Sequence, residues 1–287
     1  TFPWQPLDLW FIGDIQWHGA PNSVANEYLK RTIQKALAAE AQGHTVRFIG
    51  MGDYIDFASQ SNRARLKAAN LYDTAGDVID QKALALVDEV HDFLRPTKRK
   101  WLGLVEGHHL HELKDGTTTD MRLCESLDGT FLGTTGLLHI QFQRRTSAQR
   151  IAFTVWVHHG TGNGQTGYYP LTRLEKKSAE WEQVDVFAMG HTTKSAHEFQ
   201  NKVYPRWASQ MDLAHRKVIL LGTGGYSKTY VEGALQGRIP RGGYAEQRML
   251  NAAIIGSPVV HARPHAERIG PRREGKRTLS LELTAEG

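Results

Sequence analysis

The chain has 287 residues, of which 40% are hydrophobic, so it can bury one large core or two modest ones. No apolar run approaches the roughly 20 residues of a membrane-spanning helix, and the start of the chain lacks a signal-peptide pattern, so we expect a cytoplasmic protein without a membrane partner. The single cysteine, Cys124, excludes an internal disulfide bond and fits a reducing compartment.

Predicted strands and helices alternate in the first half of the chain. Short apolar runs predict strands, and apolar residues three and four positions apart predict helices that glycine or proline ends. Asn22 or Ser23 is a candidate cap for the first helix. In chain order we expect a strand over residues 7–12, a helix over about 24–42, a strand over 45–49, helical structure over about 58–94 with a break near 73–76, a strand over 100–105 and a short helix over 121–127.

The second half of the chain is richer in predicted strands. The glycine-rich stretch 161–167 is either a mobile linker or a loop whose backbone amides cradle a phosphate. Because no repeat or linker divides the sequence, we predict one domain over residues 1–287, with a β-rich and basic part over 200–287. The expected elements are a hairpin of 137–142 with 151–157, a helix over about 171–181, a strand over 184–189 and short strands at 218–221, 253–255 and 279–283.

Five of the predicted strands end in an aspartate or a histidine. A glycine accompanies each of them, which lets the backbone turn sharply at the strand end. Because α/β sheets place their sites at the carboxyl ends of their strands, we expect these side chains to meet and to form a metal site. The five ends are Gly13-Asp14, Gly52-Asp53, Gly107-His108-His109, His158-His159-Gly160 and Gly190-His191.

Each of these residues also has an ordinary structural interpretation. Asp14, Asp53 and His191 are of the types that form turns and caps, and His158 and His159 are able to be hydrogen-bonded core residues. The occurrence of all five strand ends in one chain favours the metal site over that alternative.

The net charge of +5 is mild, but the cations gather near the end of the chain. This gathering is either a solvated basic face or a surface that attracts phosphates, nucleic acid among them. The residues are Arg238, Arg241, Arg248, Arg263, Arg268, Arg272, Arg273, Lys276 and Arg277.

The order and spacing of the strand ends resemble the calcineurin-like metallophosphoesterases. That family's pattern is Asp-x-His, Gly-Asp-x-x-Asp/Gly, Gly-Asn-His, a lone His, and Gly-His-x-His. The matching pieces run from Leu9 to Thr193, about two thirds of the chain. The resemblance implies an α/β fold, a two-sheet α/β sandwich with helices on its outer faces, and two divalent metal ions at the strand ends. Manganese is the expected metal, with iron, zinc or magnesium as alternatives.

The resemblance also implies a role for each matching residue. Asp14 and Asp53 would hold the first ion, with Gln16 in the position of a family histidine. The second ion would be held by Asp53, His108, His191 and one residue of the His158/His159 pair, of which His159 is favoured because it directly precedes Gly160. His109 matches the histidine that protonates the leaving group, a role suited to a group that titrates near neutral pH.

The sequence departs from the family pattern at four positions. Gln16 and Thr193 stand where histidines are usual, so we expect the first ion to be held more weakly than the second. His108 replaces an asparagine and should strengthen the second site. Leu110 replaces the usual acidic residue after the catalytic histidine, which leaves Glu106, His111 or Glu112 as candidates to orient His109. His18 and His197 are either loop histidines or replacement ligands.

These residues lead us to expect a phosphoester hydrolase that uses a metal-bound hydroxide, most readily a phosphodiesterase or nuclease. The alternatives are a phosphomonoesterase acting on phosphoproteins or small metabolites, and a degenerate member that binds phosphate or nucleic acid without turnover. Trp17 and Tyr54, at strand ends, are candidates for stacking against a substrate base. The sequence gives no indication of the oligomeric state.

Overall fold

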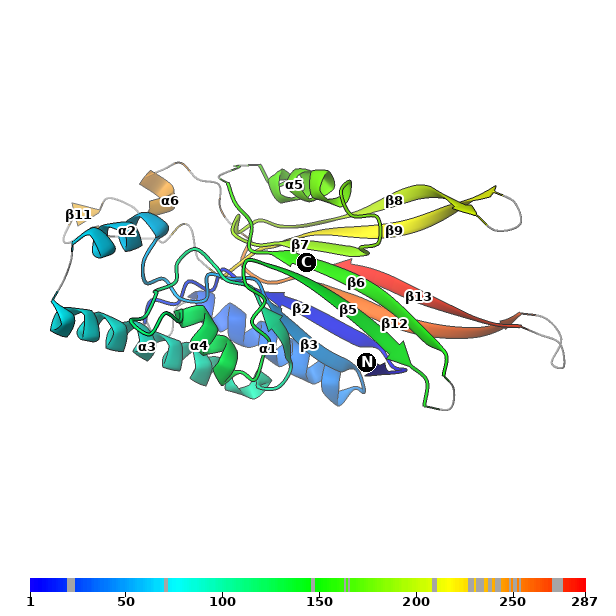
Figure 1. The fold of residues 1–287 in the computed structure, drawn as a ribbon, viewed down its shortest axis with the longest axis horizontal. Coiled ribbons are helices and arrows are strands. Elements are labelled where there is room, and N and C mark those ends of the chain that lie inside the picture. Colours follow the sequence, from blue (N-terminus) through cyan, green and yellow to red (C-terminus); the bar gives the residue numbers. More distant parts are fainter. Residues whose placement is uncertain are drawn as a thin grey trace.

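Two β-sheets lie face to face, and helices cover their outer faces (Figure 1). No helix among the described residues is long and apolar enough to cross a membrane. The structure is a computed structural model that describes residues 1–19, 24–69, 72–145, 148–162, 164, 166–207, 211–226, 230, 235–236, 239–240, 244–247, 249, 252, 254–269 and 276–287.

The five-stranded sheet is built around three parallel strands from the first third of the chain. β2 (Leu7–Ile12) pairs in parallel with β3 (Thr45–Gly50), and β3 pairs with β4 (Trp101–Leu104). The hairpin of β12 (Val259–Ile269) and β13 (Lys276–Glu286) completes the sheet, with β12 antiparallel to β2. Every residue of β2 is buried, which is why that strand is a nearly continuous apolar run.

The six-stranded sheet has the order β1-β5-β6-β7-β9-β8. β6, β7 and β9 run parallel to one another. β5 runs antiparallel to β6 and parallel to β1, and β8 runs antiparallel to β9. The strands are β1 (Phe2–Pro3), β5 (Thr135–Gln143), β6 (Arg150–His158), β7 (Val186–Met189), β8 (Ser195–Trp207) and β9 (Met211–Thr223).

The helices pack in two unequal layers. α1, α3 and α4 cover the five-stranded sheet, and α5 covers the six-stranded sheet (Figure 1). The helices are α1 (Val24–Ala41), α2 (Gln60–Ala68), α3 (Asp73–Leu94), the short 3-10 helix Arg95–Thr97, α4 (Thr119–Ser126), α5 (Tyr169–Ser178) and α6 (Tyr244–Gln247), with a small ribbon of β10 (Leu235–Gln236) and β11 (Ile239–Pro240).

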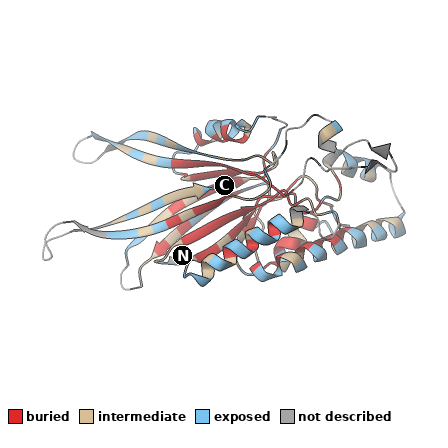
Figure 2. Ribbon diagram, turned by 180° about the vertical axis from the view of Figure 1, so that it is seen from behind, coloured by how far each residue is buried: buried red, intermediate tan, exposed pale blue. Residues whose placement is uncertain are grey.

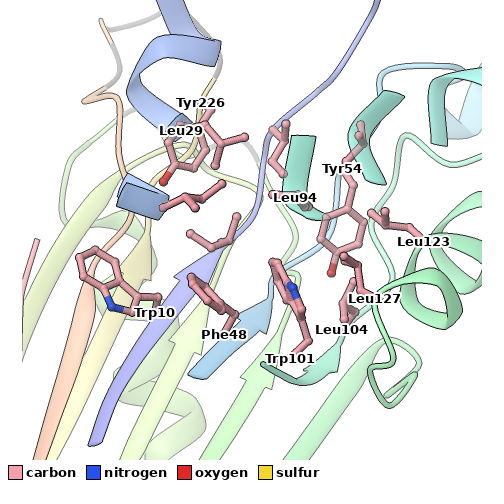
Figure 3. Close-up of a cluster of buried hydrophobic side chains, with 14 of the residues drawn as sticks. Trp10, Leu29, Phe48, Tyr54, Leu94, Trp101, Leu104, Leu123, Leu127 and Tyr226 are labelled. Atoms are coloured by element: carbon pink, nitrogen blue, oxygen red, sulfur yellow. The ribbon is translucent and has the colours of Figure 1, made fainter. Parts of the chain in front are cut away.

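Three hydrophobic clusters hold these layers together. The cluster between the sheets includes Phe11, Ile49 and Val157, all fully buried. The cluster between the five-stranded sheet and its helices includes Leu29 and Leu94 (Figure 3). A third cluster lies under α5. The parallel strands are therefore held rigidly from both faces, which fixes the positions of the loops at their carboxyl ends.

Two long hairpins, β8–β9 and β12–β13, extend past the sandwich at the end opposite those loops (Figure 1). Their outer parts are largely exposed, whereas the parts of β9 and β12 within the sandwich are largely buried (Figure 2). The described outer parts of the two hairpins thus extend the sheets without contributing to the core.

The structure confirms the α/β class and the two-sheet arrangement with outer helices. α2 ends at Ala68 and α3 begins at Asp73, so the break expected near 73–76 falls within α3, and strands 218–221 and 279–283 are parts of the longer β9 and β13. β8 and β12 were not expected. Ile255 and Gly256 form isolated bridges to Gly225 in place of the strand expected over 253–255. Residue 253 and the candidate caps Asn22 and Ser23 lie outside the described residues.

Candidate metal centre

Loops from both sheets meet at the carboxyl ends of β2, β3, β4, β6 and β7. The loops after β2 and β3 are joined by backbone hydrogen bonds, in which Asp14 N donates to Gly52 O (2.9 Å) and Gln16 N donates to Asp53 O (2.9 Å). Tyr226 N donates to Asp14 O at 2.9 Å and ties in the end of β9. Backbone hydrogen bonds alone therefore hold the loops of this edge together.

Several loop residues adopt backbone conformations that L-amino acids rarely occupy. Asp14, Gln16, Asp53, His191 and Thr193 all have φ between 47° and 66°, and they are five of the eight described non-glycine residues with positive φ. Each such residue costs on the order of 1 kcal/mol or more unless the surroundings hold it in place. The concentration of this strain at one edge marks that edge as a site.

Two glycines allow the loops to approach each other. A Cβ atom at Gly107 would lie 2.0 Å from Asp53 N, and one at Gly52 would lie 2.5 Å from His159 Nδ1. Any side chain at either position would push the ligand-bearing loops apart. The glycines that accompany the strand ends in the sequence are thus required by the packing of the site.

The described residues contain two groups of side chains that could hold a metal ion. One group is His108, His159 and His191, and the other is Asp14, Asp53 and His159; within each group the ligand atoms lie within 4.8 Å of one another. His159 belongs to both groups. The family resemblance had instead implied Asp53 as the ligand common to both ions.

The histidine group is arranged with its ring nitrogens facing inward. His108 Nδ1 and His191 Nδ1 are 3.2 Å apart, and His159 Nδ1 is 2.7 Å from Met51 O, to which it donates. That hydrogen bond leaves His159 Nε2 as the atom that faces the centre. Burial and the charge of His159 lower the pKa of His108 and lower that of His191 to about 4, so both rings are neutral and able to act as ligands near pH 7.

The carboxylate group is almost completely buried. Burial and the nearby charge of Asp53 raise the pKa of Asp14 to about 7. Burial acts in the same direction on Asp53, but contact with His159 outweighs it and lowers the pKa of Asp53. Burial opposes protonation of His159, yet Asp53 and Asp14 raise its pKa to about 9. Without a metal ion, a proton on His159 thus balances these carboxylates.

His109 is oriented by Asp56, a carboxylate for which the sequence suggested no role. His109 Nδ1 lies 2.8 Å from Asp56 Oδ1, and this hydrogen bond raises the pKa of His109. The three residues expected to orient His109 are engaged elsewhere: Glu106 accepts from Thr118, His111 pairs with Asp80 and Glu112 pairs with Lys67. Asp56 stands in the Gly-Asp-x-x-Asp motif, so the signal was present in the sequence.

Two further residues hold the loop of His108 and His109 in place. Arg63 of α2 donates to His108 O (2.6 Å) and to Leu110 O (3.2 Å). The buried Asp120 of α4 accepts a hydrogen bond from Gly107 N at 2.8 Å. Arg63 lies 45 residues before His108, and Asp120 lies 13 residues after Gly107. Nothing in their local sequence pattern singled them out.

His158 lies outside both ligand groups. Its Nδ1 accepts a hydrogen bond from Gly160 N at 2.7 Å, and its ring stacks on Trp156 with the ring centres 5.7 Å apart. Burial lowers its pKa, and the charges of Lys177 and Arg173 act in the same direction. His159 is therefore the member of the pair that the structure brings into the ligand groups.

The residues at the altered family positions are partly exposed. Gln16 and Thr193 lie in the loops that carry Asp14 and His191. His18 is exposed and lies 3.3 Å from Gln16 O through its Nδ1, and His197 is exposed on β8 against Phe199. Neither histidine belongs to a ligand group.

The two candidate stacking residues are placed differently from the expectation. Tyr54 is fully buried and donates to Val105 O at 2.9 Å, so it has no surface to offer a substrate, and the stacking role assigned to it is wrong (Figure 3). Trp17 is half-buried, packs against Phe93 and donates to Glu89 at 2.8 Å. Its side chain therefore lies against α3.

Most residues of the basic cluster near the end of the chain lie outside the part of the structure whose side chains are described. Arg263 is exposed on β12. Arg268, Lys276 and Arg277 belong to the β12–β13 hairpin, but their side chains are not described. Arg238, Arg241, Arg248, Arg272 and Arg273 lie outside the described residues, as do two positions of the 161–167 loop, residues 163 and 165.

Two buried polar atoms at the centre support the fit of a cation. Asp14 Oδ1 and His159 Nε2 are fully buried and make no hydrogen bond to any residue that the structure describes. His159 Nε2 approaches Asp53 Oδ2 to 3.2 Å, but the contact lacks hydrogen-bond geometry. Buried polar atoms are normally satisfied, and a carboxylate oxygen and an imidazole nitrogen that face one space are both donors for Mn, Fe or Zn.

Comparison with family models and with curated proteins found no match to this sequence.

Proposed function

We propose that this protein is a metal-dependent phosphodiesterase or nuclease of the calcineurin-like metallophosphoesterase type. The observation that carries the proposal is the pair of ligand groups that share His159, with His109 directly after the ligand His108 in the chain and hydrogen-bonded to a carboxylate. Ligands for two ions beside a proton donor are the parts that phosphoester hydrolysis requires.

The residues that would hold the ions follow from the two groups. Asp14 and Asp53 would hold one ion, and His108 and His191 would lie around the other. His159 has one free ring nitrogen, Nε2, and would therefore bind only one of the two ions. Divalent ions at such positions supply Lewis acidity toward a phosphoryl oxygen and activate water as a nucleophile. Asp53 Oδ1 also accepts the backbone N–H of His109 at 3.0 Å, which couples the carboxylate group to the loop of the proton donor.

His109 is the residue that moves a proton. Asp56 holds its Nδ1 and raises its pKa, so the ring stays protonated closer to neutral pH and presents Nε2 as a donor. Its side chain is 30% exposed, so a leaving-group oxygen is able to approach it from solvent. Donation to that oxygen removes the need to expel an alkoxide.

Burial excludes water from the two carboxylates and from His159. Asp14, Asp53 and His159 are each no more than 2% exposed, and Met51 and Tyr54 close the core beneath them. In such a low-dielectric setting, charge interactions with a phosphoryl group are stronger than in water.

The test compares two chromogenic substrates in the presence of Mn²⁺. We expect hydrolysis of bis(4-nitrophenyl) phosphate, a faster rate than with 4-nitrophenyl phosphate, complete loss of activity in EDTA and recovery on addition of Mn²⁺. A preference for the monoester would favour the phosphatase alternative. Absence of hydrolysis of both, with metal bound, would favour a degenerate binding protein.

A further inference from the structure

α5 joins the metal centre to an exposed, positively charged surface. The helix begins ten residues after the ligand His159, and Figure 1 shows it on the outer face of the six-stranded sheet. Leu171 and Leu174 are buried against the sheet, so the opposite side of the helix is free of the core. That side is not needed to hold the two sheets together.

Arg173 connects this surface to the loop of the ligand His159. Its Nη2 donates to Thr161 Oγ1 at 3.0 Å, and Tyr169 Oη donates to Thr161 O at 3.4 Å. Thr161 lies two residues after His159, so the guanidinium is anchored close to the ligand loop. A guanidinium has five N–H donors, and no other hydrogen bond or ion pair of Arg173 is found within the described part of the chain.

The charges of α5 leave part of this surface uncompensated. Lys177 pairs with Glu180 at 2.7 Å, whereas Arg173 and Lys176 have no carboxylate within ion-pair distance among the described residues. Arg173 lies three positions before Lys176 and four before Lys177, a spacing that puts them on neighbouring parts of one helix face. The one carboxylate within the helix is Glu175.

An aromatic ring stands at the beginning of the same helix. Tyr168 is the N-cap residue of α5 and is 76% exposed, so its ring is available to stack against a planar partner. Cations that follow a phosphate backbone, combined with an exposed aromatic ring, form the usual surface for single-stranded nucleic acid. A small phosphomonoester fits within the metal centre, so its binding would require neither the cations of α5 nor the exposed ring.

We propose that the outward side of α5, formed by Tyr168, Arg173 and Lys176, is a subsite that holds a single-stranded nucleic acid beside the metal centre. Arg173 contacts the phosphate next to the one that is hydrolysed, Lys176 contacts a more distant phosphate, and Tyr168 stacks on a base. This inference rests on the proposed phosphodiesterase function and defines its substrate as a polynucleotide.

The first test measures binding in EDTA, so that no substrate is cleaved. The probes are fluorescein-labelled dT12 and rU12, and the readout is fluorescence anisotropy over a series of salt concentrations. Arg173→Ala should weaken binding roughly tenfold at low salt and reduce the slope of log affinity against log salt by about 1. Tyr168→Ala should also weaken binding roughly tenfold but leave the slope unchanged, because stacking releases no counterions.

Matched controls lie on α3. Lys82 is an exposed cation, and Tyr72 is an N-cap tyrosine that is 89% exposed. Lys82→Ala and Tyr72→Ala should leave the affinity and the salt slope unchanged. Melting temperatures of all four variants near that of the wild type would exclude unfolding as the cause of a binding change.

The second test separates this inference from the proposed function. For Arg173→Ala, the ratio of kcat/KM on the labelled oligonucleotide to kcat/KM on bis(4-nitrophenyl) phosphate should fall about tenfold. If the wild type cleaves the small diester and the α5 variants leave both this ratio and the binding unchanged, the subsite is overturned while the function stands. If the wild type cleaves neither substrate, the proposed function fails, and the anisotropy series alone decides whether α5 binds nucleic acid.

Discussion

The two ligand groups of the metal centre differ in charge and exposure although they share His159. The group of His108 and His191 is half-buried and consists of neutral rings near pH 7, whereas the group of Asp14 and Asp53 is buried and carries the negative charge. Imidazole groups suit Zn, Fe and Mn, and carboxylates with few other donors suit Mn or Mg. We therefore expect two ions of unequal affinity.

The two groups also differ in how much backbone strain their residues carry. Both carboxylates, Asp14 and Asp53, have positive φ, whereas in the histidine group only His191 does; His108 and His159 are held by the strand end and by the hydrogen bond to Met51. The carboxylate group depends on loops that are kept in rare conformations by neighbouring loops. The histidine group depends more on the regular sheet.

The largest expected effect comes from removing the side chain of Asp53, which contacts both His159 and the backbone of His109. Asp53→Ala should lower the metal content of the purified protein strongly and reduce hydrolysis of bis(4-nitrophenyl) phosphate to the level of the blank, because its oxygens contact His159 and the backbone N–H of His109. Metal analysis of the purified variant measures the metal content, and initial rates measure the hydrolysis. Asp88→Ala, at an exposed aspartate on α3, is the control. Retention of both ions in Asp53→Ala would contradict the assignment.

His109→Ala separates chemistry from metal binding. Because His109 belongs to neither ligand group, the variant should keep the wild-type metal content while kcat falls by roughly 10²–10⁴. Substrates with better leaving groups should lose less rate, since they need less proton donation. Full activity with a poor leaving group would remove His109 from the mechanism.

Asp56→Asn should have a smaller effect with a specific pH signature. The carboxylate raises the pKa of His109, so its loss lowers that pKa and depletes the protonated ring at lower pH. The alkaline limb of kcat against pH should move to lower pH, and kcat at pH 8 should fall roughly tenfold. An unchanged alkaline limb would show that another group supplies the proton.

Gln16→His tests the inequality of the two ions directly. Exhaustive dialysis of the wild type should leave about one tightly bound ion, and added Mn²⁺ should restore the second together with activity. An imidazole at position 16 should tighten the weak site roughly tenfold, because imidazole is a better donor than an amide oxygen. Two equally retained ions in the wild type would refute the expected inequality.

The smallest effect is expected on the stability of the metal-free protein. The folded-state pKa of Asp14 is raised to about 7, above the ordinary 3.8, so ionisation of Asp14 opposes folding increasingly as pH rises from about 4 toward 7. In EDTA, Asp14→Asn should therefore raise the melting temperature at pH 8 by roughly 2–4 °C relative to the wild type. The gain should shrink toward pH 4, and a gain that does not depend on pH would point to packing instead.

Much of the site's layout could be predicted because it follows from local sequence. A short apolar strand, a glycine and then an aspartate or histidine is a pattern within ten residues, and the parallel sheets bring such ends together. Asp56 could have been found in the same way. Arg63 and Asp120 could not, because their hydrogen bonds to the 107–110 loop depend on how α2 and α4 pack.

The missed elements have a physical reason as well. β8 and the outer half of β12 carry alternating polar residues and a proline each, Pro205 and Pro264, which weakens the apolar signal of a strand. These segments are stabilised by pairing with the adjacent hairpin strands, β9 and β13, and not by burial in a core. Tyr54 was misjudged because a residue next to a ligand can face the core as readily as the solvent.

The pairing of β12 with β2 has a consequence for how the chain folds during synthesis. His261 contacts Asp8 across 253 residues of sequence, so this edge of β2 stays unpaired until β12 has left the ribosome. Contacts of such long sequence separation form slowly, and an open strand edge invites pairing with other chains. Nascent chains should therefore depend on chaperones until the C-terminal hairpin emerges and covers that edge.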